Sequence, residues 1–402
     1  MAVTAAETIG RGVTFARGFS AGAVAAGVKH PGTDRLDVAL IASDRPCAAA
    51  GVFTTNQVIA APCVVTKRHL ERGALRAIVA NSGNANACTG AAGERDAVAM
   101  AEAAADALRV SPYEVAVAST GVIGVPLPMD RLAPAIGRIT LSGQGWDAAA
   151  RAILTTDTRP KVSERELRIG GATVRIGGIA KGAGMIHPNM ATLLAFITTD
   201  AALDRAVLAT MLREAAAGTF NAISVDGDTS TNDTLLVLAN GASGVSVGSA
   251  DAAGFAEALI DVCRDLARAV VADGEGATKV FEVRVRGAAS AEDARTAART
   301  VTASNLVKTA MHGADPNWGR ILAAAGRSGA RVDETTASVR LAGVAVYESG
   351  GPCPVDGAAL RALLERAEIV VDLDLGLGDG TASAWGSDLS AEYVRINADY
   401  TT

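Results

Sequence analysis

Residues 181–200 read K-G-A-G-M-I-H-P-N-M-A-T-L-L-A-F-I-T-T-D, and they follow a segment of alternating apolar residues. That preceding segment, residues 174–180, reads V-R-I-G-G-I-A, while from Leu193 onward the sequence runs L-L-A-F-I. The second apolar run predicts a buried strand, and the glycines and proline before it predict a loop. Thr192 then lies where the loop enters the strand, a place where the surrounding fold can hold a strained backbone.

Apolar segments of strand length recur along the whole chain. They are residues 36–42, 77–80, 115–118, 193–198, 235–239, 280–285 and 369–375. Between them lie segments with apolar residues three and four positions apart, which predict helices. These are residues 95–108, 204–217, 255–272, 291–303 and 357–367. The mixture predicts a layered α/β protein.

The length of 402 residues, 49% of them hydrophobic, suffices for one large core or two coupled cores. A boundary is expected near Lys279, because residues 280–285 begin a new strand, helix and strand series after a long helix. We therefore predict a catalytic domain of residues 1–279 and a second α/β domain of residues 280–402.

Composition excludes several classes of function. The net charge of −6 is spread along the chain without a basic block, so nucleic acid is not an expected partner. Five cysteines without a C-x-x-C pair predict neither a disulfide framework nor a metal site. The sequence shows no signal peptide and no apolar run of about 18 residues, so we expect a cytoplasmic protein that does not span a membrane.

Thr192 carries the most specific chemical hypothesis. A threonine hydroxyl is a poor nucleophile and needs a base, yet none of the four histidines lies in a G-x-S-x-G setting. If the bond between Ala191 and Thr192 is cut, Thr192 gains an α-amino group with a pKa of about 7.7 to 8.0. One residue then supplies both nucleophile and base. The cut itself can begin with the same hydroxyl attacking the Ala191 carbonyl. By itself, an A-T dipeptide before a strand is weak evidence.

Seven separated blocks strengthen that hypothesis. They are N-S-G-N-A-N-A-C-T-G from Asn81, S-T-G-V-I-G from Ser119, T-T-D-T-R-P-K from Thr155, K-G-A-G-M-I-H-P-N-M-A-T-L-L from Lys181, S-V-D-G-D-T-S-T-N-D from Ser224, M-H-G-A-D-P-N-W-G-R from Met311, and the closing I-N-A-D-Y-T-T. Through them the sequence resembles the ornithine acetyltransferases, also called glutamate N-acetyltransferases, of arginine biosynthesis. The resemblance covers nearly the whole chain and implies the layered αββα-type fold shared with self-cleaving aminopeptidases and esterases.

The resemblance implies cleavage into an alpha chain of residues 1–191 and a beta chain from residue 192, with two of each forming a heterotetramer. Thr192 would take acetyl from N2-acetyl-L-ornithine and pass it to L-glutamate in a ping-pong cycle that needs no cofactor. A member that also uses acetyl-CoA would look almost the same, so the sequence does not separate the two types.

The resemblance also assigns residues to the site. The oxyanion-stabilising pair is Thr120 and Gly121, and the substrate contacts are Thr155, Lys181, Thr192, Glu275, Asn397 and Thr402. A cation at Lys181 suits carboxylates, whereas Glu275 suits an ammonium group or orients the catalytic amine. Because Asn397 and Thr402 are among the last six residues, the C-terminus would have to fold back over the site.

Two other functions remain open. The first is a self-cleaving aminopeptidase or esterase, although those relatives use a serine where this chain has Thr192. The second is a small-molecule-binding or scaffold protein that kept the fold and lost the chemistry, in which case the chain would stay uncut.

Three further features are interpreted as structural. The G-L-G-D-G run of residues 376–380 predicts a hairpin turn rather than a phosphate loop, because no Lys-Ser or Lys-Thr follows it. Asp226, Asp228 and Asp233 resemble a calcium loop, but the twelfth position holds Val237 instead of Glu, so we expect them to cap turns and line the cleft. His187 is expected to be a loop residue rather than a base.

Overall fold

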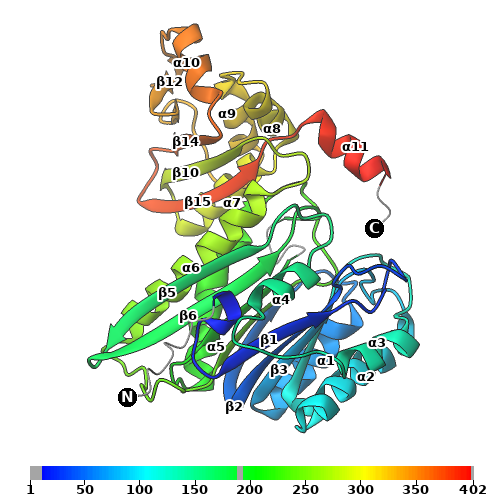
Figure 1. The fold of residues 1–402 in the computed structure, drawn as a ribbon. Coiled ribbons are helices and arrows are strands. Elements are labelled where there is room, and N and C mark those ends of the chain that lie inside the picture. The colour runs from blue at the N-terminus through cyan, green and yellow to red at the C-terminus, as the bar shows by residue number, and fades with distance from the viewer. Residues whose placement is uncertain (1–10, 188–192, 400–402) are drawn as a thin grey trace, which may run out of the picture.

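The computed structural model describes residues 11–187 and 193–399, and it contains two mixed β-sheets joined by a long helix (Figure 1). The first sheet has the order β4-β3-β2-β9-β7-β6-β5, with β1 paired to β2. Its strands are β1 (Phe19–Val24), β2 (Val38–Phe53), β3 (Leu75–Asn81), β4 (Val115–Ser119), β5 (Lys161–Ile169), β6 (Ala172–Lys181), β7 (Leu194–Thr199) and β9 (Thr234–Ala239).

The second sheet has the order β13-β12-β11-β14-β10-β15-β8. Its strands are β8 (Ile223–Ser224), β10 (Val280–Ala288), β11 (Ser338–Leu341), β12 (Val344–Glu348), β13 (Gly351–Pro352), β14 (Glu368–Asp374) and β15 (Gly380–Ser387). The short strand β8 precedes residue 280 and pairs with β15, so this sheet is not built from residues 280–402 alone. The two-domain division stays a prediction.

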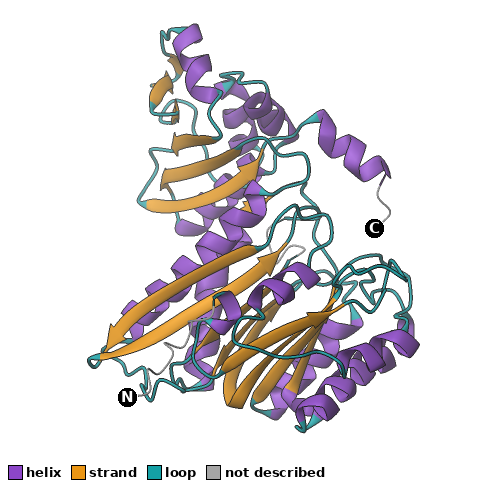
Figure 2. Ribbon diagram, viewed as in Figure 1, coloured by secondary structure: helices purple, strands orange, loops and turns teal. Residues whose placement is uncertain are grey.

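Helices cover the sheets, as Figure 2 shows by colour. They are α1 (Ala61–Arg72), α2 (Gly90–Leu108), α3 (Met129–Ile136), α4 (Trp146–Ala152), α5 (Arg205–Ala217), α6 (Ala252–Ala272), α7 (Ala291–Thr302), α8 (Asn305–His312), α9 (Trp318–Gly326), α10 (Gly357–Leu364) and α11 (Ala391–Asp399). Short 3-10 turns are η1 (Gly12–Thr14), η2 (Pro112–Glu114) and η3 (Phe220–Ala222). Among the helices of the described ranges, none is long and apolar enough to cross a membrane.

Strand β7 shows why the fold is layered. Its residues alternate between two cores: Ala195 and Ile197 pack into the core that contains α5 and α6, whereas Leu194 and Phe196 pack into the core that contains η1 and α4. All four are buried, because a strand in the middle of a covered sheet places successive side chains on opposite faces. The predicted layered α/β class is confirmed.

The predicted hairpin at residues 376–380 is wrong. β14 and β15 both pair with β10, which lies between them, so the connection crosses the end of β10 instead of turning back on β14. The N–H groups of Leu375 and Leu377 donate to the carbonyls of Arg286 and Gly287, at 2.9 and 2.7 Å, which fixes this crossing. A glycine-rich turn ends a strand, but it does not determine which strand comes next in the sheet.

Candidate active site

A cavity of about 410 Å³ lies among the ends of β4 and β6, the loop before β9, the turn after α6, and α11. Six residues named from the sequence line it: Thr120, Gly121, Thr155, Lys181, Glu275 and Asn397. They come from five separate segments of the chain. Ala191, Thr192 and Thr402 lie outside the described residues.

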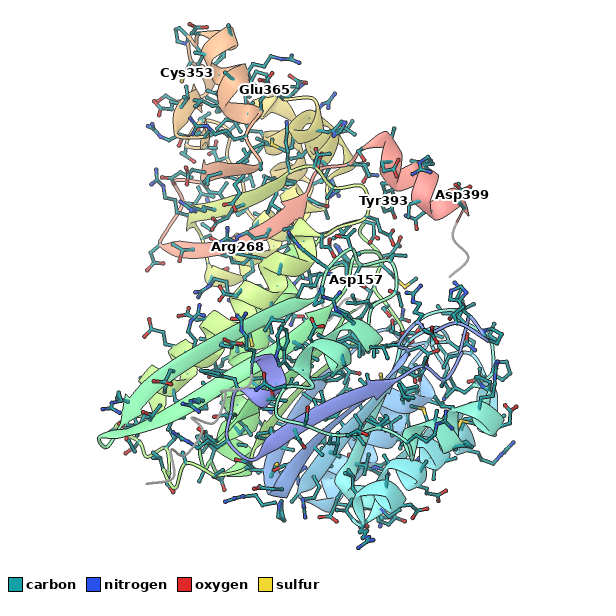
Figure 3. All side chains as sticks on the ribbon, in the orientation of Figure 1. Asp157, Arg268, Cys353, Glu365, Tyr393 and Asp399 are labelled. Atoms are coloured by element: carbon teal, nitrogen blue, oxygen red, sulfur yellow. The ribbon has the colours of Figure 1, made fainter. Side chains whose placement is uncertain are left out.

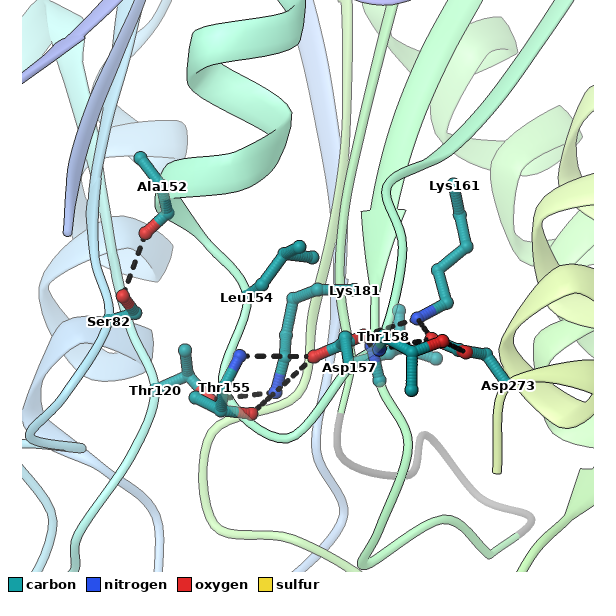
Figure 4. Close-up of polar contacts among 12 residues, drawn as sticks. Ser82, Thr120, Ala152, Leu154, Thr155, Asp157, Thr158, Lys161, Lys181 and Asp273 are labelled. Carbon is teal, nitrogen blue, oxygen red and sulfur yellow. Dashed lines mark hydrogen bonds and ion pairs between the residues drawn. The ribbon is translucent and has the colours of Figure 1, made fainter. Parts of the chain in front are cut away.

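Lys181, the last residue of β6, provides the buried cation of this cavity. Its Nζ donates to Oγ1 of Thr155 at 2.8 Å and to Oγ1 of Thr120 at 3.2 Å, as Figure 4 shows. Burial lowers the pKa of Lys181, while the carboxylate of Asp157, 4.0 Å away, opposes that shift. The ammonium group is therefore poorly solvated and favours a carboxylate that enters the cavity.

Thr120 and Gly121 both line the cavity, and each carries a hydrogen-bond donor. The hydroxyl of Thr120 accepts from Lys181, so its own hydrogen can point elsewhere, and its backbone N–H donates to Asn81 O at 3.0 Å. Among the described residues, none accepts the N–H of Gly121, and Gly121 lines the cavity. One hydroxyl and one backbone N–H are thus available to an oxygen that becomes negatively charged.

Gly121 cannot be replaced without moving the backbone. Its φ is 129°, and a Cβ at this position would lie 2.2 Å from the carbonyl of Gly83. We expect Gly121→Ala to lower kcat by about 10²- to 10³-fold, the usual cost of one misplaced oxyanion donor, with a smaller change in KM. Steady-state kinetics will measure this.

Gly124 offers a matched control for that substitution. It lies in the same turn with a φ of 82°, but nothing lies within 4 Å of the Cβ it would acquire. Gly124→Ala therefore carries the cost of the left-handed backbone without the clash, and its kcat should stay within about threefold of wild type. Equal losses in both variants would contradict the role of Gly121.

Glu275 is a buried carboxylate in the turn after α6. Its backbone N–H donates to Ala183 O at 2.9 Å, and its Oε2 accepts from Nδ2 of Asn397 at 2.7 Å. A Cβ on Gly184 would lie 2.5 Å from this carboxylate, so only glycine lets the Glu275 carboxylate come this close to the backbone. Asn397 belongs to α11, on which Figure 3 labels Tyr393 and Asp399, so the chain does return to the cavity near its C-terminal end.

Two aspartates bind the backbone on either side of residues 188–192. Asp226 accepts the N–H groups of Met185 and Ile186 at 2.5 and 2.9 Å, and burial raises its pKa to about 6. Asp233 is fully buried and accepts the N–H of Leu193 at 3.0 Å. Burial raises the pKa of Asp233 well above its ordinary value, which favours the neutral acid.

The expectation that three aspartates line the cleft is therefore right for two of them. Asp226 and Asp228 line the cavity, while Asp233 holds Leu193 instead. His187 lines a different, smaller cavity together with residues of α7, and it lies in a loop as expected. Within residues 11–187 and 193–399, no group of three or more His, Cys, Asp or Glu side chains could hold a metal ion.

Sequence reasoning missed a buried ion-pair network next to Lys181. Lys161, whose side chain is 0% exposed, pairs with Asp157 and, at 2.6 Å, with Asp273 at the end of α6. Asp157 also accepts the N–H of Gly182 at 2.6 Å. Figure 4 shows Asp157 and Asp273 on either side of the Lys161 ammonium group. Burial alone would raise the pKa of Asp157, but the two lysines outweigh it and hold the pKa below its usual range. The only sequence signal was the T-T-D-T-R-P-K block.

The fold and this cavity define a layered α/β enzyme whose site combines a buried cation, a buried carboxylate and a free backbone N–H. Such a set suits a small substrate that carries both charges. The profile of the ArgJ family matches residues 20–402, and the chain belongs to that family. It is accordingly an acetyltransferase of arginine biosynthesis.

One relative matches along nearly the whole chain, and two solved chains match about half of it. The arginine biosynthesis bifunctional protein ArgJ of Symbiobacterium thermophilum is 54% identical over 401 residues, which cover 98% of this chain and 100% of that protein. A crystal structure of the same-named protein from Bacillus halodurans is 42% identical and covers 51% of this chain and 98% of its own, with a TM-score of 0.50. A crystal structure of Mycobacterium tuberculosis ornithine acetyltransferase complexed with ornithine is 42% identical and covers 46% and 96%, with a TM-score of 0.39.

Proposed function

We propose that the chain cuts itself between Ala191 and Thr192 and that Thr192 then carries acetyl from N2-acetyl-L-ornithine to L-glutamate. The observation that carries this proposal is the cavity, because six residues named from the sequence line it although they come from five segments. Leu193, the next residue after Thr192, is held in place by Asp233.

The lengths of the relatives support the cut. The S. thermophilum protein matches over its full length, whereas the B. halodurans crystal chain matches over 98% of its length and covers only 51% of this chain. A solved chain of about half length is what cleavage near the middle of a relative would produce. The expected fragments of residues 1–191 and 192–402 have that size.

The two fragments would stay together because they share one sheet. β7 and β9 belong to the second fragment and β2 and β6 to the first, yet β7 pairs with β6 and β9 pairs with β2 through six residues each. Breaking these ladders would expose the cores on both faces of the sheet. We propose that two copies of each fragment form a heterotetramer.

In the first half-reaction, the Thr192 hydroxyl attacks the acetyl carbonyl of acetylornithine, and the α-amine of Thr192 takes the hydroxyl proton. The carbonyl oxygen becomes negative and receives hydrogen bonds from the Thr120 hydroxyl and the Gly121 N–H. The bond between the acetyl carbon and N2 then breaks, the proton passes to N2, and ornithine leaves an acetyl ester on Thr192.

In the second half-reaction, the neutral α-amine of glutamate attacks that ester. The attacking nitrogen loses a proton, the ester bond to Thr192 breaks, and the Thr192 oxygen regains a proton as N-acetyl-L-glutamate leaves. The same two donors stabilise the second oxyanion, so one site performs both steps. No cofactor is needed, because Thr192 itself carries the acetyl group from one amino acid to the other.

Charge in the cavity suggests how each substrate is held. Lys181 would bind a carboxylate, and Glu275 would bind the side-chain ammonium group of ornithine. We expect Glu275→Gln to raise KM for acetylornithine about tenfold, since an amide cannot replace a charged partner, and to raise KM for glutamate less. Initial rates at varied concentrations of both substrates will separate the constants.

Glu257→Gln, an exposed position on α6, is the matched control and should change neither constant. If Glu275→Gln instead lowers kcat equally for both substrates and leaves KM unchanged, the carboxylate orients the Thr192 amine and this prediction is wrong.

An isotope-exchange experiment tests the reaction itself. With labelled ornithine and unlabelled acetylornithine, a ping-pong acetyl-enzyme exchanges label into acetylornithine in the absence of glutamate. A hydrolase would instead release acetate at a rate that glutamate does not change, and a binding protein would do neither. Either of those results would overturn the proposal.

Two of the relatives named above, those of S. thermophilum and B. halodurans, are called bifunctional, and we propose acetyl-CoA as a second acetyl donor to glutamate for this chain. We propose that the reaction takes place in the cytoplasm. Replacing acetylornithine by acetyl-CoA in the same assay will show whether N-acetylglutamate still forms.

A further inference from the structure

A second cavity, of about 430 Å³, lies against the second sheet and shares no lining residue with the acetyl-transfer cavity. Helices α6 and α7 and strands β10 and β15 form its walls, together with the turn after α5. Figure 3 labels Arg268 where α6 passes β15. Nothing in the proposed reaction uses this cavity.

Four arginines line it: Arg264 and Arg268 on α6, and Arg295 and Arg299 on α7. Each pair is spaced four residues apart, so both side chains lie on one face of their helix, where like charges repel. Glu282 is the one acidic residue among the lining residues that the structure describes. This concentration of positive charge occurs in a chain whose net charge is −6.

Carboxylates outside the lining hold three of these guanidinium groups. The pairs are Arg264 with Asp261 at 2.5 Å, Arg268 with Glu368 at 3.2 Å, and Arg295 with Glu292 at 2.7 Å. The three arginine side chains are 42–46% exposed. A guanidinium group has five N–H donors, and each pair uses one or two of them. The remaining donors are positioned but can still bind a ligand.

Arg299 and Trp385 add to the same wall. Burial lowers the pKa of Arg299, and the positive charge of Arg295 lowers it further, while Glu292 opposes the shift. The two arginines of α7 are therefore close enough to repel each other. Trp385 is 6% exposed, and its Nε1 has no hydrogen-bond partner among the described residues. Because that nitrogen is itself buried, Trp385 adds apolar surface to the lining rather than a donor for a ligand.

We propose that this cavity binds a small molecule carrying at least two phosphate groups, held between the arginines of α6 and α7. The planar guanidinium group matches phosphate oxygens in pairs, and because the arginines stand on two helices, a ligand with two phosphate groups can contact both helices. The ligand is either a free nucleotide or pyrophosphate, or the nucleotide part of a coenzyme A thioester. The inference does not depend on the acetyl-transfer mechanism, because no lining residue is common to both.

Calorimetric titration of the full protein with pyrophosphate, ADP and coenzyme A at low ionic strength tests the proposal. We expect all three to bind wild-type protein, with affinity that falls as salt is added. The double variant Arg268→Gln/Arg295→Gln should weaken binding by at least about tenfold for each arginine removed. Arg361→Gln on α10, an exposed arginine that pairs with Glu365, is the control and should bind like wild type.

Two further measurements separate a lost site from a misfolded variant. Glu282→Gln removes the one lining carboxylate and should tighten binding, an effect that unfolding cannot produce. Acetyl transfer from acetylornithine should be unchanged in the double variant, because Arg268 and Arg295 lie outside the acetyl-transfer cavity.

The KM for acetyl-CoA identifies the ligand. If this KM rises in the double variant, the thioester is the source of the phosphates. If it does not rise, the ligand is a free nucleotide or pyrophosphate. Absence of binding to wild type at millimolar ligand, or equal binding by the double variant, would overturn the inference.

Discussion

Thr192→Ala should remain a single chain of 40.5 kDa, whereas wild-type protein should give two fragments, the second beginning at Thr192. The reason is that the hydroxyl which attacks the Ala191 carbonyl has been removed, and no other group at this position can form the ester intermediate. Denaturing mass spectrometry of freshly purified protein measures both masses directly.

The same variant should lose acetyl transfer by at least about 10⁴-fold, because removal of a covalent nucleophile generally costs that much or more. Thr192→Ser is the control: it keeps a hydroxyl and should still cut and still transfer acetyl, at a reduced rate. A Thr192→Ala protein that is cut at this bond, or that transfers acetyl at the wild-type rate, would refute the proposed mechanism.

Apolar periodicity located the central elements of both sheets. The runs at residues 193–198 and 235–239 became β7 and β9, and the run at 280–285 became β10. β7 and β9 are buried at every residue, so nearly every residue must be apolar and the signal in the sequence is strong. In β10 buried apolar residues alternate with charged ones, which is the pattern of a strand with one exposed face.

Strands with weaker signals were missed for a physical reason. β5 reads K-V-S-E-R-E-L-R-I and lies at the edge of the first sheet, where one face meets solvent and charged residues are tolerated. β15 contains glycine, serine and alanine with the single large residue Trp385. Short apolar runs also give no information about pairing, which is why the loop at 376–380 was taken for a hairpin.

Sequence motifs predicted some residues of the candidate site. Other residues could not be predicted, because only tertiary contacts bring them together. Thr120, Lys181 and Asn397 stand in blocks of recognisable sequence, and the structure brings them to one cavity. Lys161 ends the T-T-D-T-R-P-K block, but its partner Asp273 lies 112 residues away, and nothing local distinguishes Asp273 from a solvated surface charge. Burial makes the loss of either partner of such an ion pair strongly destabilising, and burial is a property of the folded chain alone.

Lys161→Met should be the most destabilising single substitution near the site. It removes the cation between Asp157 and Asp273, whose side chains are 0% and 4% exposed, and leaves two buried carboxylates facing each other. Breaking a buried pair in this way typically costs about 3–5 kcal/mol. For a chain of this length that cost lowers the melting temperature by on the order of 5 °C, which differential scanning fluorimetry at pH 7 can measure.

The pH dependence of the stability lost in Lys161→Met shows whether the loss comes from charge. In wild type the pKa of Asp157 is depressed, so the stability that its charge contributes is present above the ordinary aspartate pKa near 3.9 and is lost as the pH falls through the depressed value. Without Lys161 the pKa of Asp157 should rise instead, so the variant gains stability when that carboxylate binds a proton. The difference in melting temperature should therefore shrink as the pH falls from 7 toward 4.

The double variant Lys161→Met/Asp273→Asn should recover part of the loss at pH 7, because one of the two facing charges is gone. A loss that is independent of pH and unchanged in the double variant would mean that Lys161 contributes packing rather than charge. It would also mean that the network does not hold Asp157 against Gly182 and Lys181.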